Sequence, residues 1–392
     1  MSIDKTGVIV GDGQVNYTSY PGLIPNNLTW EKVTTYDVGV DVDMFKNRLT
    51  IGFDWYRRNT TDMYTVGPTL PEVLGTTQPK GNYADLKTKG WELTLSWRDN
   101  FKLAGSDFHY GVKFMLWDSQ SWITKYNNAT GKLSDYYEGY RIGDIWGYNI
   151  EGLFTSYDEI ANHADQDYIK VSDSKIWQPG DLKFADLNGD GKIDKGAQTL
   201  SDHGDLVIVG NEEERYHYGF NLNVGWKGIG ISAFFQGVGK RDWYPGQETG
   251  FFWGKYNRPY GYSLKMHENR WTEENPNPNA YWPRLVGYSS ENGGRPMGTP
   301  NNRYMQDASY LRLKALTVDY SLPQAWVSKL GLTGLKIYFT GENLFTFSNV
   351  CENFDPEVIK GGDVDLKDRK GEEQGYSYPM LKTYTVGLNV SF

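Results

Sequence analysis

Apolar and polar residues alternate strictly along several segments of this chain, and the segment 383–392 shows the pattern most fully. Its apolar residues fall on one face of an extended strand: Tyr384, Val386, Leu388, Val390 and Phe392. About ten residues suit a half-buried antiparallel strand of a soluble protein, and they equally suit a tilted strand that crosses the hydrocarbon core of a bilayer. From this segment alone, both interpretations stay open.

The same alternation predicts eight further strands. They lie at 36–42, 49–55, 91–97, 108–116, 216–226, 229–235, 311–320 and 335–339. Within 311–320 the apolar positions slip by one residue between Ala315 and Leu316, which predicts a β-bulge. Helix is expected only as a short stretch near 325–330. The chain is therefore predicted to be all-β and antiparallel.

The links between the predicted strands are alternately short and long. Tight turns such as 45–48 and 227–228 alternate with long polar links such as 57–86 and 240–306. Transmembrane barrels have this arrangement, with short periplasmic turns and long outer loops. The segment 143–154 could form a tenth strand, but counting it would reverse the alternation. We therefore place it in an outer loop.

This pattern predicts a transmembrane β-barrel portion of about nine strands with long extracellular loops. It consists of an outer loop at 1–30, four strands in 31–117, a large outer loop at 118–213, and five strands with long outer loops in 214–392. A nine-stranded sheet would leave two open edges, which lipid does not tolerate. We expect the chain to be part of a larger barrel.

Composition agrees with a barrel and excludes several other classes. The mean hydropathy of -0.61 leaves no stretch of roughly 18 apolar residues for a membrane helix, yet it suits strands whose second face is polar. The net charge of -9 argues against nucleic acid as a partner. The single cysteine, Cys351, excludes an internal disulfide framework. The first residues lack the pattern of a signal peptide.

Aromatic residues make up 15% of the chain, and several stand at the ends of predicted strands. They are Trp55, Trp91, Trp97, Tyr216, Trp226 and Tyr384. Amphipathic rings at this position are typical of the interfacial girdles of a barrel. The alternative is that they pack the core of a soluble all-β protein.

The most specific local motif lies at 186–194 and resembles a calcium-binding loop. Oxygen ligands would come from Asp186, Asn188, Asp190, the backbone carbonyl of Lys192, and Asp194. Gly191 permits the sharp turn that such a loop needs. Position 12 of the motif is Ala197, so the bidentate glutamate is absent. The motif therefore predicts a weak structural calcium site, with an ion-free turn rich in Asp and Asn as the alternative.

The link 240–306 is unusually rich in aromatic residues. As candidate ligand-binding residues we take Trp243, Tyr244, Phe252, Trp253 and Tyr256. Aromatic faces stack on sugar rings and also suit protein partners. Alternatively, these residues pack the loop against itself. Sequence motifs of hydrolases, zinc proteases and nucleotide-binding enzymes are absent, so we predict no enzymatic activity and no catalytic residues.

Motifs near the end of the chain resemble the C-terminal barrel portion of SusC/RagA-type TonB-dependent outer-membrane transporters. They are Gly341-Glu-Asn-Leu-Phe345, Asn353-Phe-Asp-Pro-Glu357 and Val386-Gly-Leu-Asn-Val-Ser-Phe392. Further stretches resemble the family in the same order: Leu28-Thr-Trp-Glu31, Lys89-Gly-Trp-Glu-Leu93, the 186–194 loop, Phe234-Phe-Gln-Gly237 and Asp307-Ala-Ser-Tyr-Leu-Arg312. One departure is Glu214-Arg215-Tyr216, where relatives tend to have Pro-Arg-Tyr.

The resemblance implies a 22-strand barrel with an N-terminal plug, which has no counterpart in this chain. It implies import of an oligosaccharide or peptide across the outer membrane. The implied partners are a SusD-like surface lipoprotein, and TonB through the missing N-terminal part. The alternative function is a soluble all-β surface module that binds glycans without transport.

Overall fold

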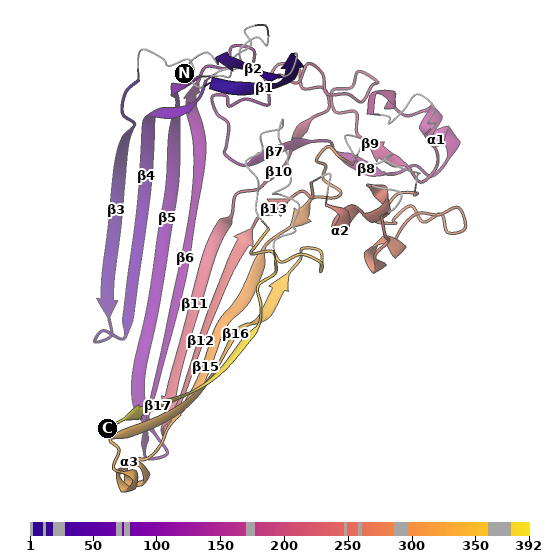
Figure 1. Cartoon of the computed structure of the whole chain (residues 1–392). Coiled ribbons are helices and arrows are strands. Elements are labelled where there is room, and N and C mark those ends of the chain that lie inside the picture. Colours follow the sequence, from indigo (N-terminus) through magenta and orange to yellow (C-terminus); the bar gives the residue numbers. More distant parts are fainter. Residues whose placement is uncertain are drawn as a thin grey trace.

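The structure is a computed structural model that describes residues 3–10, 13–18, 28–67, 73, 79–169, 177–246, 249–257, 261–285, 297–359 and 378–392. Its main feature is a nine-stranded antiparallel sheet in the order β17-β16-β15-β12-β11-β6-β5-β4-β3. The strands are β3 (Lys32–Met44), β4 (Leu49–Val66), β5 (Lys80–Leu103), β6 (Ser106–Tyr126), β11 (Arg215–Trp226), β12 (Ile229–Lys240), β15 (Tyr310–Ser321), β16 (Gly334–Ser348) and β17 (Thr383–Ser391). The nine predicted strands are confirmed, and they form one curved wall (Figure 1).

Several strands extend further than the alternation predicted. The predicted link 57–86 is wrong over most of its length, because β4 continues to Val66 and pairs with β5 from Lys80 onward. Strand β6 likewise continues to Tyr126, into the predicted large loop. At the loop end of the sheet, both faces of a strand can contact water. The backbone hydrogen bonds therefore continue beyond the residues in which apolar and polar side chains alternate. The predicted bulge is confirmed at Lys314, where the pairing with β16 shifts between Leu313 and Ala315.

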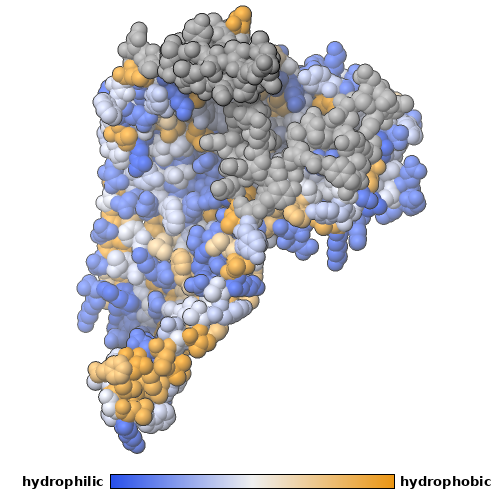
Figure 2. Space-filling view, viewed as in Figure 1, coloured by the Kyte–Doolittle hydropathy of each residue, from blue (hydrophilic) through white to orange (hydrophobic). Residues whose placement is uncertain are grey.

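One face of the sheet carries an apolar surface that the described residues leave uncovered. Val38 on β3 is 64% exposed, Ile337 on β16 is 46% exposed and Val386 on β17 is 76% exposed. Figure 2 shows an apolar patch at the lower end of the sheet, where the C-terminus lies. The soluble sandwich predicts a second sheet over this face, and the described strands do not include one. The exposed apolar face is instead suited to lipid.

The opposite face is polar and faces the lumen. In two places a tyrosine ring lies over a glycine of the neighbouring strand: Tyr56 over Gly90 and Tyr338 over Gly387. A Cβ at either glycine would collide with the ring, so these positions require glycine. Such tyrosine–glycine pairs cover the bare backbone and fix the register between adjacent strands.

The long connections gather at one end of the sheet and the short turns at the other (Figure 1). The loops contain β7 (Asp144–Gly147), β8 (Ile150–Leu153), β9 (Leu182–Phe184), β10 (Val207–Asn211), β13 (Asp242–Trp243) and β14 (Gln306–Asp307), with helices α1 (Tyr157–Ala161) and α2 (Gly250–Trp253). Three 3-10 helices accompany them: η2 (Asp167–Ile169), η3 (Gly254–Tyr256) and η4 (Lys265–Glu268). Strand β7 pairs with β10 and strand β8 pairs with β9, both outside the main sheet. This confirms that 143–154 belongs to a loop.

Two further elements complete the fold. Residues 1–30, predicted to be a loop, contain a hairpin of β1 (Ile3–Val10) and β2 (Gly13–Thr18) outside the main sheet. The helix expected near 325–330 is confirmed as α3 (Gln324–Val327) followed by the 3-10 helix η5 (Ser328–Leu330). In the described part of the chain, none of the helices has the length and apolarity to cross a membrane.

Candidate functional site

The outer loops pack into one hydrophobic core beside the lumen face. Its buried members come from three long connections, and they include Tyr148, Phe184, Trp253, Trp282 and Phe354. The rings of Tyr256 and Trp282 stack with centroids 5.1 Å apart, and Trp282 also stacks on Tyr304 at 5.2 Å. The loops therefore form a folded cap rather than separate mobile links.

The five aromatic residues predicted to bind a ligand belong to this core. Trp243, Tyr244, Phe252, Trp253 and Tyr256 are all buried, none of them more than 8% exposed. Their polar atoms are bonded internally: Trp253 Nε1 donates to the carbonyl of Gly246 at 2.9 Å, and the Tyr256 hydroxyl donates to that of Pro283 at 2.7 Å. Ligand binding by these residues stays a prediction, and the structure shows them buried inside the loop core. They pack the loop against itself, because so many rings gain more from mutual burial than from contact with water.

His267 is enclosed by the same aromatic rings. Its Nδ1 accepts the Leu264 backbone N–H at 2.8 Å, so the proton must be on Nε2, which donates to the Phe252 carbonyl at 2.7 Å. Burial, with a smaller contribution from the nearby charge of Arg270, lowers the pKa of His267. The neutral ring thus joins two turns of the cap.

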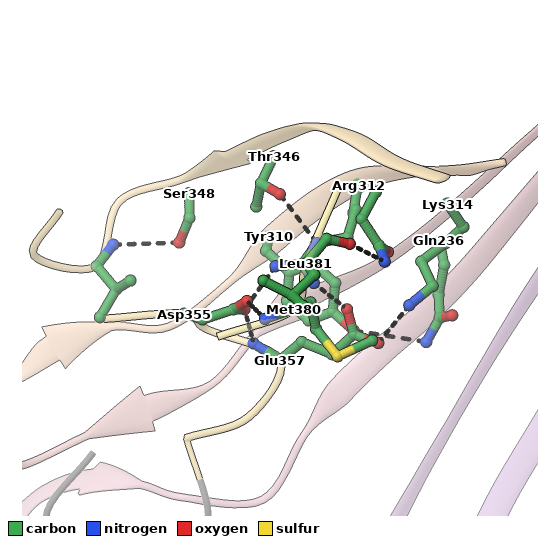
Figure 3. A network of polar contacts seen from close by, with 12 residues as sticks. Gln236, Tyr310, Arg312, Lys314, Thr346, Ser348, Asp355, Glu357, Met380 and Leu381 are labelled. Carbon is green, nitrogen blue, oxygen red and sulfur yellow. Dashed lines mark hydrogen bonds and ion pairs between the residues drawn. The ribbon is translucent and has the colours of Figure 1, made fainter. Parts of the chain in front are cut away.

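An ionic cluster attaches the cap to the barrel wall. Arg312 on β15 is almost fully buried and pairs with Asp355 at 2.5 Å and with Glu357 at 2.7 Å (Figure 3). Lys314 pairs with Glu357 at 2.7 Å, and Arg312 Nε donates to Thr346 Oγ1 on β16 at 2.9 Å. Two cations thus face two carboxylates. We call these four charged residues the ionic clamp.

The ionic clamp also fixes the chain on both sides of the last outer loop. Asp355 accepts the backbone N–H of Glu357 at 3.0 Å and that of Met380 at 2.9 Å. Phe354, beside the clamp in the sequence, packs against Trp243 of the loop core with ring centroids 4.9 Å apart. Contacts of Asp355 and Phe354 therefore join the wall, the last outer loop and the aromatic core.

The polar wall carries an aromatic surface that the sequence pattern did not predict. Trp117 of β6 and His217 of β11 are directly paired and stack at 5.3 Å with an interplanar angle of 5°. Trp117 is 39% exposed, and Glu214 lies 3.7 Å from the His217 ring. Trp117 directly follows Leu116, the last residue of the predicted strand. Adjacent strand residues point to opposite faces, so Trp117 lies on the face opposite the apolar one. That alternation was the available signal that it faces the lumen.

The predicted calcium loop is a tight turn closed by its own carboxylates. Asp186 accepts the backbone N–H groups of Gly189 and Gly191 at 2.7 and 2.9 Å, and Asp190 accepts that of Lys192 at 2.8 Å. Asn188 accepts the N–H of Asp190 at 3.0 Å, whereas Asp194 turns to the N–H of Gly196 at 2.7 Å. Across the described ranges, no three His, Cys, Asp or Glu side chains converge as metal ligands. Calcium therefore stays a prediction.

Comparison with known proteins shows what the chain is similar to. The model of the TonB dependent receptor-like β-barrel family matches residues 7–188. TonB-dependent receptor P3 of Formosa agariphila is 28% identical over 399 residues, which cover 98% of this chain and 36% of that receptor. TonB-dependent receptor SusC of Bacteroides thetaiotaomicron is 25% identical over 387 residues, which cover 96% of this chain and 33% of SusC. The solved structure of the RagAB peptide transporter superposes with a TM-score of 0.69 at 21% sequence identity. The match covers 100% of this chain and 38% of the RagAB chain.

The family-model match and the relatives together support a β-barrel fragment of a TonB-dependent receptor, as the motifs predicted. The similarity to SusC and the shared fold with RagAB support the SusC/RagA type. It spans about a third of the length of the curated relatives that it matches.

Proposed function

We propose that the intact protein imports a nutrient across the outer membrane in a TonB-dependent manner. This chain would supply part of the barrel wall and the outer loops around the entrance. The observation that carries the proposal is the clamp between Arg312 and Asp355, which holds a folded loop cap against a polar lumen wall. An entrance needs such a rigid frame, since binding residues on loops are effective only when a scaffold positions them.

We propose an oligosaccharide or a peptide as the substrate. The stacked pair of Trp117 and His217 offers a flat aromatic face on the lumen wall, and the carboxylate of Glu214 lies beside it. A ring face binds the apolar side of a sugar or the side chain of a peptide, and the carboxylate accepts hydroxyl or amide hydrogens. Among similar structures is one described as a peptide transporter, which supports the peptide class.

We further propose that a SusD-like lipoprotein covers the outer mouth, and that TonB acts on the protein through sequence outside this chain. The packed aromatic core supports the first partner, because it gives the outer loops a defined upper surface on which another protein can rest.

The function is tested by gene deletion and complementation in the organism that encodes the protein. Growth of the deletion strain is compared on single purified oligosaccharides and on peptides as the limiting nutrient. We expect loss of growth on one nutrient class, rescue by the intact gene, and a strong reduction of uptake when the inner-membrane gradient is dissipated. Unchanged growth and uptake on every nutrient tested would contradict the proposal. Co-purification with a lipoprotein, lost when the outer loops are deleted, tests the partner.

A further inference from the structure

A basic patch lies on the lipid-facing side of β4 and β5, directly beyond the last aromatic pair. Trp55 pairs with Trp91, and two residues further toward the loops Arg57 pairs with Lys89. Alternate residues of a strand share a face, so Arg57 and Lys89 follow the tryptophans on the apolar side of the sheet. Lys87 comes next on the same face and is paired with Trp122 of β6. We call Arg57, Lys87 and Lys89 the basic patch.

The height of the patch places it at the level of the outer-leaflet headgroups. One residue advances a strand by about 3.3 Å, and a barrel strand is tilted by roughly 40°, so Arg57 and Lys89 lie about 5 Å above the tryptophans. Tryptophans mark the boundary of the hydrocarbon core, and the interfacial layer beyond it is about 5–8 Å thick. Arg57 and Lys89 are therefore at the level of the lipid phosphate groups, and Lys87, four residues beyond Trp91, lies about 10 Å above the tryptophans, just beyond that layer.

Part of the patch lines a pocket. The pocket has a volume of about 260 Å³, and its lining includes Lys87, Lys89, Trp122 and Glu138. The Lys87 ammonium lies 5.7 Å from the centroid of the Trp122 ring, so an aromatic floor orients it. Ligand pockets for whole small molecules begin near roughly 300 Å³, so this one suits a headgroup fragment.

The charge of the pocket favours an anion. Two lysines face one carboxylate, and Arg57 adds a third cation close by. Across the described ranges, neither lysine forms an ion pair, whereas Arg57 donates to Asn59 at 3.1 Å. This local excess of cations contrasts with the net charge of -9 of the whole chain. Lysine and arginine at a membrane surface attract anionic lipid headgroups.

We propose that the basic patch binds a phosphate group of an outer-leaflet lipid. A soluble anion would reach the lumen or the outer loops, and Glu138 of an outer loop does line the pocket, whereas Arg57, Lys87 and Lys89 continue the surface that faces lipid. The bound phosphate would neutralise the cations and anchor the loop-proximal ends of β4 and β5 at a fixed depth in the membrane. Such anchoring would keep the cap at a constant height above the membrane during transport.

The test measures lipid retention by the intact receptor, with any flanking sequence it has, purified in detergent. Diphosphoryl lipid A is added, and bound lipid is counted by native mass spectrometry. The variant Lys87→Gln/Lys89→Gln is expected to bind about thirty-fold more weakly, from about five-fold for each cation at a membrane surface. The matched control Lys46→Gln/Lys113→Gln removes the same charge from a short turn and from the lumen face, and should bind as the unmodified receptor does.

Comparison arms identify the source of the phosphate. Lipid A without phosphate should bind no better to the unmodified receptor than to the double variant. Inorganic phosphate at millimolar concentration should leave bound lipid A in place. Equal retention by the double variant and the unmodified receptor would overturn the proposal. So would equal loss in the control variant, or displacement of the lipid by inorganic phosphate, which would indicate a site for a soluble anion.

Discussion

Arg312 on β15 and Asp355 in the last outer loop are 43 residues apart in sequence, yet their side chains form a buried ion pair of 2.5 Å. The two residues belong to separate family-like motifs, the stretch that ends at Arg312 and the stretch 353–357. The ion pair gives both motifs one physical role: a charge on the wall requires an opposite charge in the loop, since neither is stable alone when buried.

Removing Arg312 should release the last outer loop from the wall. Arg312→Ala leaves Asp355 without its cation and Glu357 with Lys314 alone, and an unpaired buried charge costs about 3–5 kcal/mol. Hydrogen exchange of the backbone at 349–359 in the intact receptor should become markedly faster. The control is Lys102→Gln, which breaks an ion pair of similar length, 2.7 Å, between two exposed side chains. Exposed pairs contribute at most about 1 kcal/mol, so the control should leave exchange in that loop unchanged. Normal protection of 349–359 in Arg312→Ala would show that the clamp does not hold the loop.

Trp282 should be essential for the fold of the cap. Its ring is fully buried and stacks on both Tyr256 and Tyr304. Trp282→Ala should lower the free energy of unfolding of the cap by about 3–5 kcal/mol, and limited proteolysis should then cleave the 261–285 segment. Trp326→Ala removes a tryptophan of helix α3 that is 60% exposed, and it should leave the cleavage pattern unchanged. Equal protease resistance of both variants would mean that the loops do not share a core.

The wall was predictable from the sequence because its physics is local. Apolar and polar side chains must alternate along each strand in contact with lipid. This alternation predicted all nine strands and the one-residue slip near Ala315. Where lipid contact ends, the constraint ends as well. The continuation of β4 to Val66 therefore left no apolar pattern, although its hydrogen bonds continue.

The site was less predictable because its contacts are distant in sequence. Composition located the aromatic loop 240–306, but it could not tell a ring that binds a ligand from a ring such as Trp253 that fills a core. That distinction depends on Trp282 and Tyr304, which meet Trp253 only after the loop has folded. The stack of Trp117 on His217 joins residues on two strands separated by the large outer loop, so spacing gave no signal for it.

Acid should loosen the cap through His267. Its pKa is lowered by burial in the folded state, whereas the unfolded value is about 6.5. The stabilising contribution of the neutral ring is therefore complete above about pH 6.5, and it decreases as the pH falls below that value, by at most about 1.4 kcal/mol per pH unit. Hydrogen exchange at 261–285, corrected for the intrinsic rate, should be faster at pH 5.5 than at pH 7.5. His267→Gln should abolish this difference, and His163→Gln, on a partly exposed ring, should retain it. The same acid response in His267→Gln would assign the effect to another group.

Trp117 should contribute to substrate contact without contributing to the fold of the barrel. It faces the lumen and is 39% exposed, so Trp117→Ala removes a stacking surface and leaves no buried cavity. Uptake of the nutrient identified by growth tests should fall about five-fold or more, if one stacking contact is worth about 1 kcal/mol. Trp226→Ala, on the opposite face beside a short turn, should transport normally. Loss of transport in Trp226→Ala alone would place the important aromatic contacts on the membrane side.

The loop 186–194 offers a direct test for calcium. Its carboxylates already accept backbone N–H groups, yet each carboxylate oxygen has a second lone pair that could face an ion. We expect weak binding in the millimolar class, since the bidentate glutamate of the full motif is replaced by Ala197. Calcium at about 10 mM should slow hydrogen exchange across 186–205, whereas magnesium should not, because its rigid octahedral geometry does not fit such a turn. Asp186→Asn/Asp190→Asn should remove the effect, and Asp158→Asn/Asp167→Asn should preserve it. Identical exchange with and without calcium would make the loop a turn stabilised by Asp and Asn side chains alone.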